Sequence, residues 1–172
     1  MLIPTLDAKS GGGWLALAIS SNCFRGTHSS ISIIGVVTAP LRKQGGVLIV
    51  GMGVDITEVD RIQEAIERHG EPFLRRLYTA DERNYCEQFK NKYERFAGRF
   101  AAKEAAMKAL GTGWRQGVRW VDLEVVREKN GRPTLALSGE AAKIAAQLGV
   151  KHIALSITHT ETQALAQVIF EA

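Results

Sequence analysis

Residues 98–113 read Gly98-Arg-Phe-Ala-Ala-Lys-Glu-Ala-Ala-Met-Lys-Ala-Leu-Gly-Thr-Gly113, and this stretch constrains the fold more than any other part of the chain. Its alanines, leucine, methionine and lysines favour a helix, and its later glycines stand where a C-terminal cap is expected. At about 100° per residue, Arg99 and Lys103 share one side of that helix. Glu104 and Lys108 share another. The stretch therefore predicts a helix with two charged sides that ends in a Gly-Thr-Gly turn.

Two interpretations of this charge pattern are open. A carboxylate beside ammonium groups, followed by a glycine turn, suits the binding of a metal-bound polyphosphate. Glu104 before Lys108 is equally the favoured order for an ordinary solvated pair on a helix surface. The first interpretation gains support only from a second motif that lies upstream.

The upstream motif begins with an apolar run, Val47–Val54, which is typical of a strand buried on both faces. Asp55 ends the run. Thr57, with Asp60 three residues on, fits the start of a helix. An acid at the end of a buried strand is held rigidly and can bind a hard cation, whereas capping the next helix is the other role open to Asp55.

Three blocks share the order and approximate spacing of one protein family. They are Gly51-Met-Gly-Val-Asp-Ile-Thr-Glu-Val-Asp-Arg-Ile62, the helix motif of residues 98–113, and Ser156-Ile-Thr-His-Thr160. Together they closely resemble the holo-[acyl-carrier-protein] synthases, the small bacterial members of the 4′-phosphopantetheinyl transferase superfamily. The resemblance runs from about Val47 to the C-terminus. The combination is specific, although no single block would be.

Hairpin-joined strands beside separate helical patterns predict an α+β fold with a mainly antiparallel sheet packed with helices. Asn130-Gly131 is the strongest hairpin signal, and Thr79 with Glu82 forms a capping box that opens a helix. Further helices are expected over about 58–69, 92–110 and 138–148, and strands near 47–54, 121–125, 134–137, 151–158 and 164–170. The resemblance implies the same class, a 4′-phosphopantetheinyl transferase-like fold.

The resemblance implies transfer of the 4′-phosphopantetheine arm of coenzyme A to a serine of apo acyl-carrier protein, with release of adenosine 3′,5′-bisphosphate. It further implies a cytoplasmic enzyme of fatty acid biosynthesis, a homotrimer whose active sites lie between neighbouring subunits. Because the nucleophile belongs to the carrier, no catalytic serine or cysteine is required here. Charge must be neutralised as the diphosphate bond breaks. Mg²⁺ suits this because it takes one or two carboxylates and fills its other positions with substrate oxygens and water.

By match to the family motifs, Asp55 and Glu104 are the expected Mg²⁺ ligands and catalytic acids. Removal of the serine proton falls either to Glu104 or to a metal-bound water, and the sequence does not choose between them. Lys108, the third expected catalytic residue, shares a helix side with Glu104 and is expected to neutralise a diphosphate oxygen of coenzyme A. Lys103 is a second candidate for that contact.

Other residues are expected to bind the phosphates of coenzyme A. The backbone N–H groups of Gly111, Thr112 and Gly113 can approach phosphates closely because glycine has no Cβ, although helix-ending glycines are common. His159 alone reads as a surface or capping residue at a strand end. The resemblance gives it contact with the nucleotide phosphates, with assistance from Arg99.

The resemblance assigns docking of the acidic carrier to the first helix. The expected docking residues are Arg61, Arg68, Arg75 and Arg76. Glu64 and Glu67 lie among these arginines, so an ordinary solvated face is the alternative. Glu71 is a departure, because family members often have more basic character there, and it bears on carrier affinity rather than on the chemistry.

Residues 1–46 differ from the rest of the chain. They are rich in glycine and serine, and they hold four basic residues and one acid, which supply +3 of the net charge of +4. The remaining +1 is no general basic coat for nonspecific nucleic-acid binding, and no apolar run reaches membrane-spanning length. Neither nucleic acid nor membrane is an expected partner. We expect 47–172 to be the transferase domain and 1–46 to be a misassigned start or a poorly ordered extension.

Two other functions are compatible with parts of the sequence. A broader phosphopantetheinyl transferase would act on polyketide or peptide-synthase carriers, but such enzymes are usually longer chains with two related halves, and this chain has one copy. A noncatalytic phosphate- or nucleic-acid-binding module would use Trp114-Arg-Gln-Gly-Val-Arg-Trp120, where bases and aromatics alternate in a way that suits stacking on nucleotides. Packing of both tryptophans in the core or at a subunit contact is the competing interpretation.

Overall fold

The structure is a computed structural model that describes residues 48–113 and 116–172, and the prediction for residues 1–46 lies outside this part of the chain. Its elements in chain order are β1 (Ile49–Glu58), α1 (Val59–Leu77), α2 (Ala80–Glu87), α3 (Lys92–Leu110), η1 (Trp120–Asp122), β2 (Leu123–Arg127), β3 (Pro133–Leu137), α4 (Gly139–Gln147), β4 (His152–His159) and β5 (Gln163–Glu171). The predicted α+β class is confirmed. Of the helices in the described part, none is long and apolar enough to cross a membrane.

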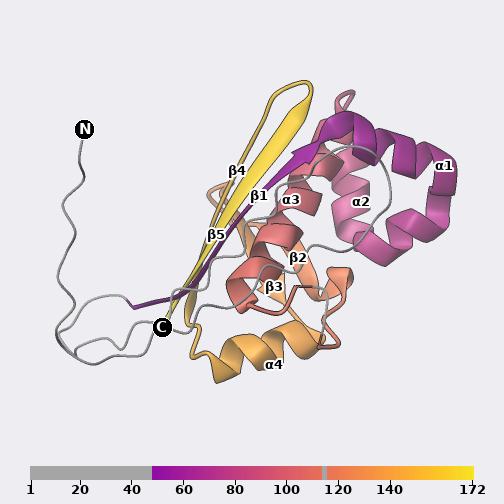
Figure 1. Ribbon diagram of the computed structural model, residues 1–172. Coiled ribbons are helices and arrows are strands. Elements are labelled where there is room, and N and C mark those ends of the chain that lie inside the picture. Colours follow the sequence, from indigo (N-terminus) through magenta and orange to yellow (C-terminus); the bar gives the residue numbers. More distant parts are fainter. Residues whose placement is uncertain (1–47, 114–115) are drawn as a thin grey trace, which may run out of the picture. The chain divides into compact units, whose positions relative to one another are not determined.

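The strands form two antiparallel sheets. One has the order β1-β5-β4, and the other is the β2-β3 hairpin. The predicted Asn130-Gly131 turn joins β2 to β3, with Gly131 at a φ of 87° that favours glycine. Figure 1 shows α1 and α2 beside one end of α3, and α4 beside the other.

Helix α3 occupies the bounds predicted for it and lies directly on β1 and β5. The contact with β1 depends on two glycines, because a Cβ at Gly51 or Gly53 would collide with a backbone carbonyl oxygen of α3. The opposite face of β1 exposes Met52, Val54 and Ile56, at 44, 42 and 54%. The prediction of a strand buried on both faces is therefore wrong for the single chain. The glycine contact sets one face of β1 against α3 and leaves the other apolar face open.

Two apolar clusters meet along α3. One gathers around its C-terminal half and includes residues of α4 and β5, and the other gathers around its N-terminal half and includes residues of α1 and α2. Trp120 packs against both and stacks on Phe100, with ring centroids 4.8 Å apart. This ring is therefore engaged within the protein, in agreement with the packing interpretation. Trp114 lies outside the described residues.

Helix α1 is interrupted at Gly70, just beyond the end predicted for the first helix at about residue 69. Gly70 has a φ of 57° and a ψ of −138°, a conformation essentially restricted to glycine, and Pro72 follows it. The first part of α1 and its last two turns are therefore separate helical segments joined at a kink. The predicted capping box at Thr79 and Glu82 is present at the start of α2.

Candidate active site

Asp55 lies within β1 rather than at its end, because the strand continues to Glu58. The N-cap of α1 is Glu58, which forms no side-chain capping hydrogen bond. Thr57 Oγ1 instead donates to Asp55 Oδ2 over 2.9 Å. The predicted N-cap at Thr57 is therefore wrong, although the helix begins near the expected residue 58, and the Thr57 hydroxyl orients the carboxylate on the strand.

Lys108 reaches Asp55 across the glycine contact between β1 and α3. Its ammonium donates to Asp55 Oδ1 over 2.9 Å and to the Val54 carbonyl over 3.0 Å. The side chains of Lys108 and Asp55 are 7% and 12% exposed, so this ion pair is shielded but open to solvent. The fold thus joins two residues that lie far apart in sequence, a contact that the sequence analysis did not predict.

Glu104 lies one helical turn before Lys108 on α3, and the charges of Asp55 and Lys108 both shift its pKa. Burial and then the Asp55 carboxylate raise the pKa of Glu104 to about 7, although Lys108 and Arg61 act to lower it. The two predicted acids therefore converge within one chain. A carboxyl group with a pKa near neutrality can hold or release a proton at physiological pH.

The two acids fit a magnesium site of the kind that substrate completes. Within the described residues no group of three or more histidine, cysteine, aspartate or glutamate side chains could hold a metal ion. Mg²⁺ commonly takes only one or two protein carboxylates and completes its octahedron with phosphate oxygens and water. The repulsion that raises the pKa of Glu104 is also what a divalent cation between two carboxylates relieves.

Apart from the site of Asp55, Glu104 and Lys108, a cluster of cations surrounds a cavity of about 170 Å³ between α3, the β2-β3 hairpin and the end of β4. Arg95, Arg99, Arg127 and His159 line it together with Tyr85. The Arg99 guanidinium lies 4.2 Å and that of Arg127 5.3 Å from the Tyr85 ring centroid. Among the described residues, Arg99 Nε is one of two buried side-chain polar atoms without a hydrogen-bond partner. The cavity is therefore suited to an anion.

The sequence did not single out Arg95, Arg127 or Tyr85. These residues come from α3, β2 and α2, and they meet only because the hairpin folds back toward the helices. Arg95 was visible as a base four residues before Arg99, hence on the same side of the helix. No sequence signal places Arg127 beside them.

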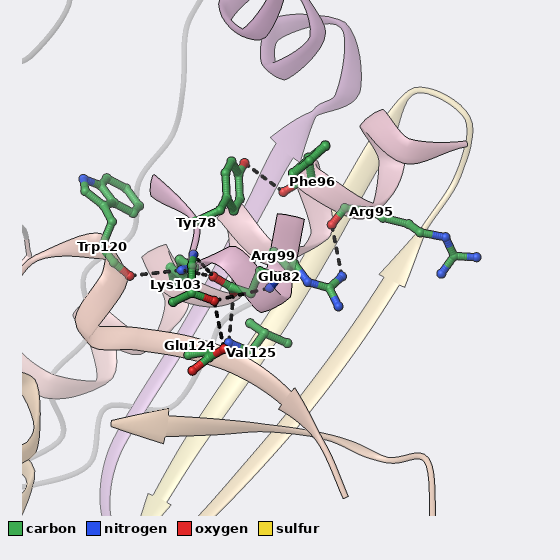
Figure 2. A network of polar contacts seen from close by, with 10 residues as sticks. Tyr78, Glu82, Arg95, Phe96, Arg99, Lys103, Trp120, Glu124 and Val125 are labelled. Atoms are coloured by element: carbon green, nitrogen blue, oxygen red, sulfur yellow. Dashed lines mark hydrogen bonds and ion pairs between the residues drawn. The ribbon is translucent and has the colours of Figure 1, made fainter. Parts of the chain in front are cut away.

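Lys103 points toward Glu82 and the Trp120 carbonyl in the protein interior (Figure 2). Its side chain is 0% exposed, and its ammonium donates to Glu82 Oε2 over 2.6 Å and to the Trp120 carbonyl over 3.0 Å. Glu82 also accepts from Val125 N. Burial lowers the pKa of Lys103, and the Glu82 carboxylate opposes that effect. This arrangement does not provide the predicted contact of Lys103 with a phosphate, because its buried ammonium is bound to Glu82 and the Trp120 carbonyl.

The Gly-Thr-Gly turn ends α3 as predicted, with Gly111 at a φ of 73°. Gly111 N donates to the Lys108 carbonyl, and Thr112 N and Gly113 N donate to the Met107 carbonyl. All three N–H groups therefore satisfy the end of the helix. Phosphate contacts through these N–H groups stay a prediction, and they would compete with the hydrogen bonds that end the helix.

Comparison with known proteins agrees with these motifs. The sequence profile of the 4′-phosphopantetheinyl transferase superfamily matches residues 51–168. A holo-[acyl-carrier-protein] synthase of Solibacter usitatus is 60% identical over 124 residues, which are 72% of this chain and 99% of the relative. That of Koribacter versatilis is 55% identical with the same coverage. The chain belongs to the holo-[acyl-carrier-protein] synthase family.

Solved holo-[acyl-carrier-protein] synthases share the fold. That of Bacillus anthracis, in complex with CoA (3′,5′-ADP), is 38% identical, has a TM-score of 0.60, and matches over 74% of this chain and 99% of its own. That of Neisseria meningitidis is 32% identical, has a TM-score of 0.66, and matches over 73% of this chain and 100% of its own. The described residues therefore have the fold of the holo-[acyl-carrier-protein] synthases.

The four arginines that the holo-[acyl-carrier-protein] synthase resemblance assigns to carrier docking are all exposed on α1. The charge of Arg61 reaches the acid pair, since it lowers the pKa of Glu104. Arg75 instead lies after the kink and forms a 2.6 Å ion pair with Glu71, which also binds Arg83 over 2.6 Å. Glu71 therefore neutralises part of this face, as its departure from the family pattern suggests.

Proposed function

We propose that this chain transfers the 4′-phosphopantetheine group of coenzyme A to a serine of apo acyl-carrier protein and releases adenosine 3′,5′-bisphosphate. The observation that carries the proposal is the meeting of Asp55, Glu104 and Lys108 across the contact between β1 and α3. Family membership supplies the reaction class. Residues 47–172 are the proposed transferase domain.

The acid pair is the proposed site of bond cleavage. Asp55 and Glu104 would hold Mg²⁺, which when bound neutralises charge on the diphosphate as its bond opens. Lys108 adds a fixed positive charge beside them. The pKa of about 7 describes Glu104 without metal, and a bound Mg²⁺ would lower it. Either Glu104 or a metal-bound water is therefore the proposed acceptor of the serine proton.

The cationic cavity is the proposed site of the second anionic group of coenzyme A. Besides its diphosphate, coenzyme A carries one phosphate monoester, on the 3′ position of the ribose. Arg99 offers a buried guanidinium whose Nε has no partner among the described residues, and His159 lies on the same cavity. Arg95 and Arg127 complete a set of cations that matches a phosphate dianion.

A homotrimer with shared active sites is part of the proposal. Arg99 and Glu104 are five residues apart on α3, which separates their directions by about 140° around the helix axis. One nucleotide reaches both sites more readily when each is supplied by a different subunit. The exposed apolar face of β1, with Met52, Val54 and Ile56, provides a surface for a neighbouring copy to cover.

The carrier is proposed to dock on the exposed face of α1. The charge of Arg61 on this face also acts on Glu104, whose pKa it lowers. Arg68 lies two turns further along the same side of α1. Fatty acid biosynthesis in the cytoplasm is the proposed setting. Attraction of an acidic carrier to these arginines should weaken as ionic strength rises.

The direct test is to incubate the protein with coenzyme A, Mg²⁺ and apo acyl-carrier protein and then to weigh the carrier by mass spectrometry. We expect a mass gain equal to one phosphopantetheine group, and none when EDTA replaces Mg²⁺. Asp55→Asn and Glu104→Gln should each abolish the gain, while Asp81→Asn, an exposed acid on α2, should not. An unmodified carrier with the wild-type protein and Mg²⁺ would refute the proposed transfer.

A further inference from the structure

His159, the last residue of β4, is held by the first turn of α3. Its Nδ1 lies 3.0 Å from Glu94 Oε2, and the two side chains are 35% and 21% exposed. Asn91 Nδ2 donates to the same carboxylate oxygen over 2.9 Å, and Asn91 Oδ1 accepts from Arg95 Nε over 3.2 Å. A continuous polar network therefore runs from a cation of the cavity, through Asn91 and Glu94, to the imidazole.

Glu94 is out of place on electrostatic grounds. It lines the cationic cavity that the proposed function gives to a phosphate, and a carboxylate there repels such a ligand. A first-turn acid favours the N-terminus of a helix, but an acid at any exposed position of that turn would do the same. The contact with His159 is what distinguishes Glu94 from an ordinary first-turn acid.

We propose that Glu94 is a positioning residue for coenzyme A binding that acts through His159. With Nδ1–H donated to Glu94, the ring is fixed and Nε2 is left for the phosphate oxygen. A carboxylate at one nitrogen and a phosphate at the other both accept hydrogen bonds, so the imidazole donates from both when the ligand is bound. The inference rests on the proposed function and concerns the 3′-phosphate of coenzyme A.

The sign of the effect separates positioning from simple repulsion. Glu94→Ala should weaken coenzyme A binding about three- to tenfold, the range expected for one partly exposed charge-assisted hydrogen bond. Repulsion alone predicts the opposite, tighter binding. In the transfer assay KM for coenzyme A should rise with kcat unchanged, and Glu94→Gln, which keeps an acceptor, should recover part of the loss. Glu161→Ala removes an exposed acid two residues from His159 and should leave binding unchanged or tighten it.

The experiment is calorimetric titration of the full-length protein with coenzyme A and with 3′-dephospho-coenzyme A, beside the transfer assay. Glu94→Ala should affect only the first ligand, and it should add nothing in a His159→Ala background because both changes break one interaction. Tighter binding by Glu94→Ala, or effects that add in the double variant, would overturn the inference. If the wild type binds coenzyme A without transferring it, the proposed function fails while the titration still decides the role of Glu94.

Discussion

Two lysines of helix α3 form ion pairs with carboxylates of other elements, and the two pairs differ in what surrounds them. Lys103 and Glu82 are both 0% exposed, and the Trp120 carbonyl and Val125 N–H complete their hydrogen bonds. Lys108 and Asp55 are 7% and 12% exposed and lie beside Glu104, whose pKa is raised. The first pair is complete within the protein, whereas the second leaves a third charge to be neutralised from outside. Two lysines of one helix thus serve structure on one side and, we propose, catalysis on the other.

The largest effect should come from breaking the buried Lys103–Glu82 pair. Lys103→Met leaves the Glu82 carboxylate buried without its cation, and removal of one partner from such a pair costs about 3–5 kcal/mol. Urea denaturation of the purified variant measures this loss.

A double variant provides the control for that change. Glu82→Gln/Lys103→Met removes both charges, so most of the lost stability should return. If the double variant is as unstable as Lys103→Met alone, the damage comes from lost packing and not from an unpaired buried charge.

Breaking the Lys108–Asp55 pair should slow the transfer reaction and change the stability little. Lys108→Met removes the fixed cation beside the proposed cleavage site, and we expect kcat to fall about 10²- to 10³-fold with a small change in stability. Carrier mass measured over time gives the rate, and urea denaturation gives the stability. A variant that unfolds like Lys103→Met yet retains its rate would reverse the two roles.

Glu104 should make the stability of the protein depend on pH when EDTA keeps the site free of metal. The pKa of Glu104 rises from 4.5 to about 7 on folding, so its contribution is full below the lower value and is lost as pH rises through the higher. Glu104→Gln removes this titration. The variant should match the wild type near about pH 5 and exceed it by about 2 kcal/mol near about pH 8.

Denaturant titrations at these two pH values supply the measurement. Glu128→Gln, an exposed change in the β2-β3 turn, is the control and should show no such difference. An equal effect of Glu104→Gln at both pH values would mean that the carboxyl group is ionised throughout.

The smallest effect is expected at the docking face, which lies outside both pairs. Glu71 binds Arg75 and Arg83, which lowers the pKa of Glu71 and occupies both guanidinium groups. Glu71→Gln frees them, so KM for the acidic carrier should fall about two- to threefold at low salt. The change should vanish at high salt, and an unaltered KM at low salt would exclude Arg75 and Arg83 from docking.

The sequence predicted α3 because its signals are local, whereas the convergence of Asp55 and Glu104 is implied by the family resemblance. A run of helix formers and a left-handed glycine define the helix and its end. The contact between Lys108 and Asp55 is made across the tertiary fold. The kink at Gly70 follows from local chemistry, as the helix end does.

What escaped prediction depends on tertiary contacts. Periodicity gave Lys103 the correct side of α3, but only the fold shows that Glu82 closes that side. The apolar run of β1 indicates a buried strand, and its open face is visible only once α3 and β5 are in place. Arg127 joins the cavity through the hairpin, which no local pattern encodes.

The central claim is that Asp55, Glu104 and the diphosphate of coenzyme A bind one divalent cation together. Crystals grown with coenzyme A and Mn²⁺ in place of Mg²⁺ test it through an anomalous difference map. We predict one strong peak within about 2.0–2.3 Å of a carboxylate oxygen of each residue, in contact with the diphosphate. A well-bound coenzyme A with no peak there, or a peak that touches neither carboxylate, would contradict the account.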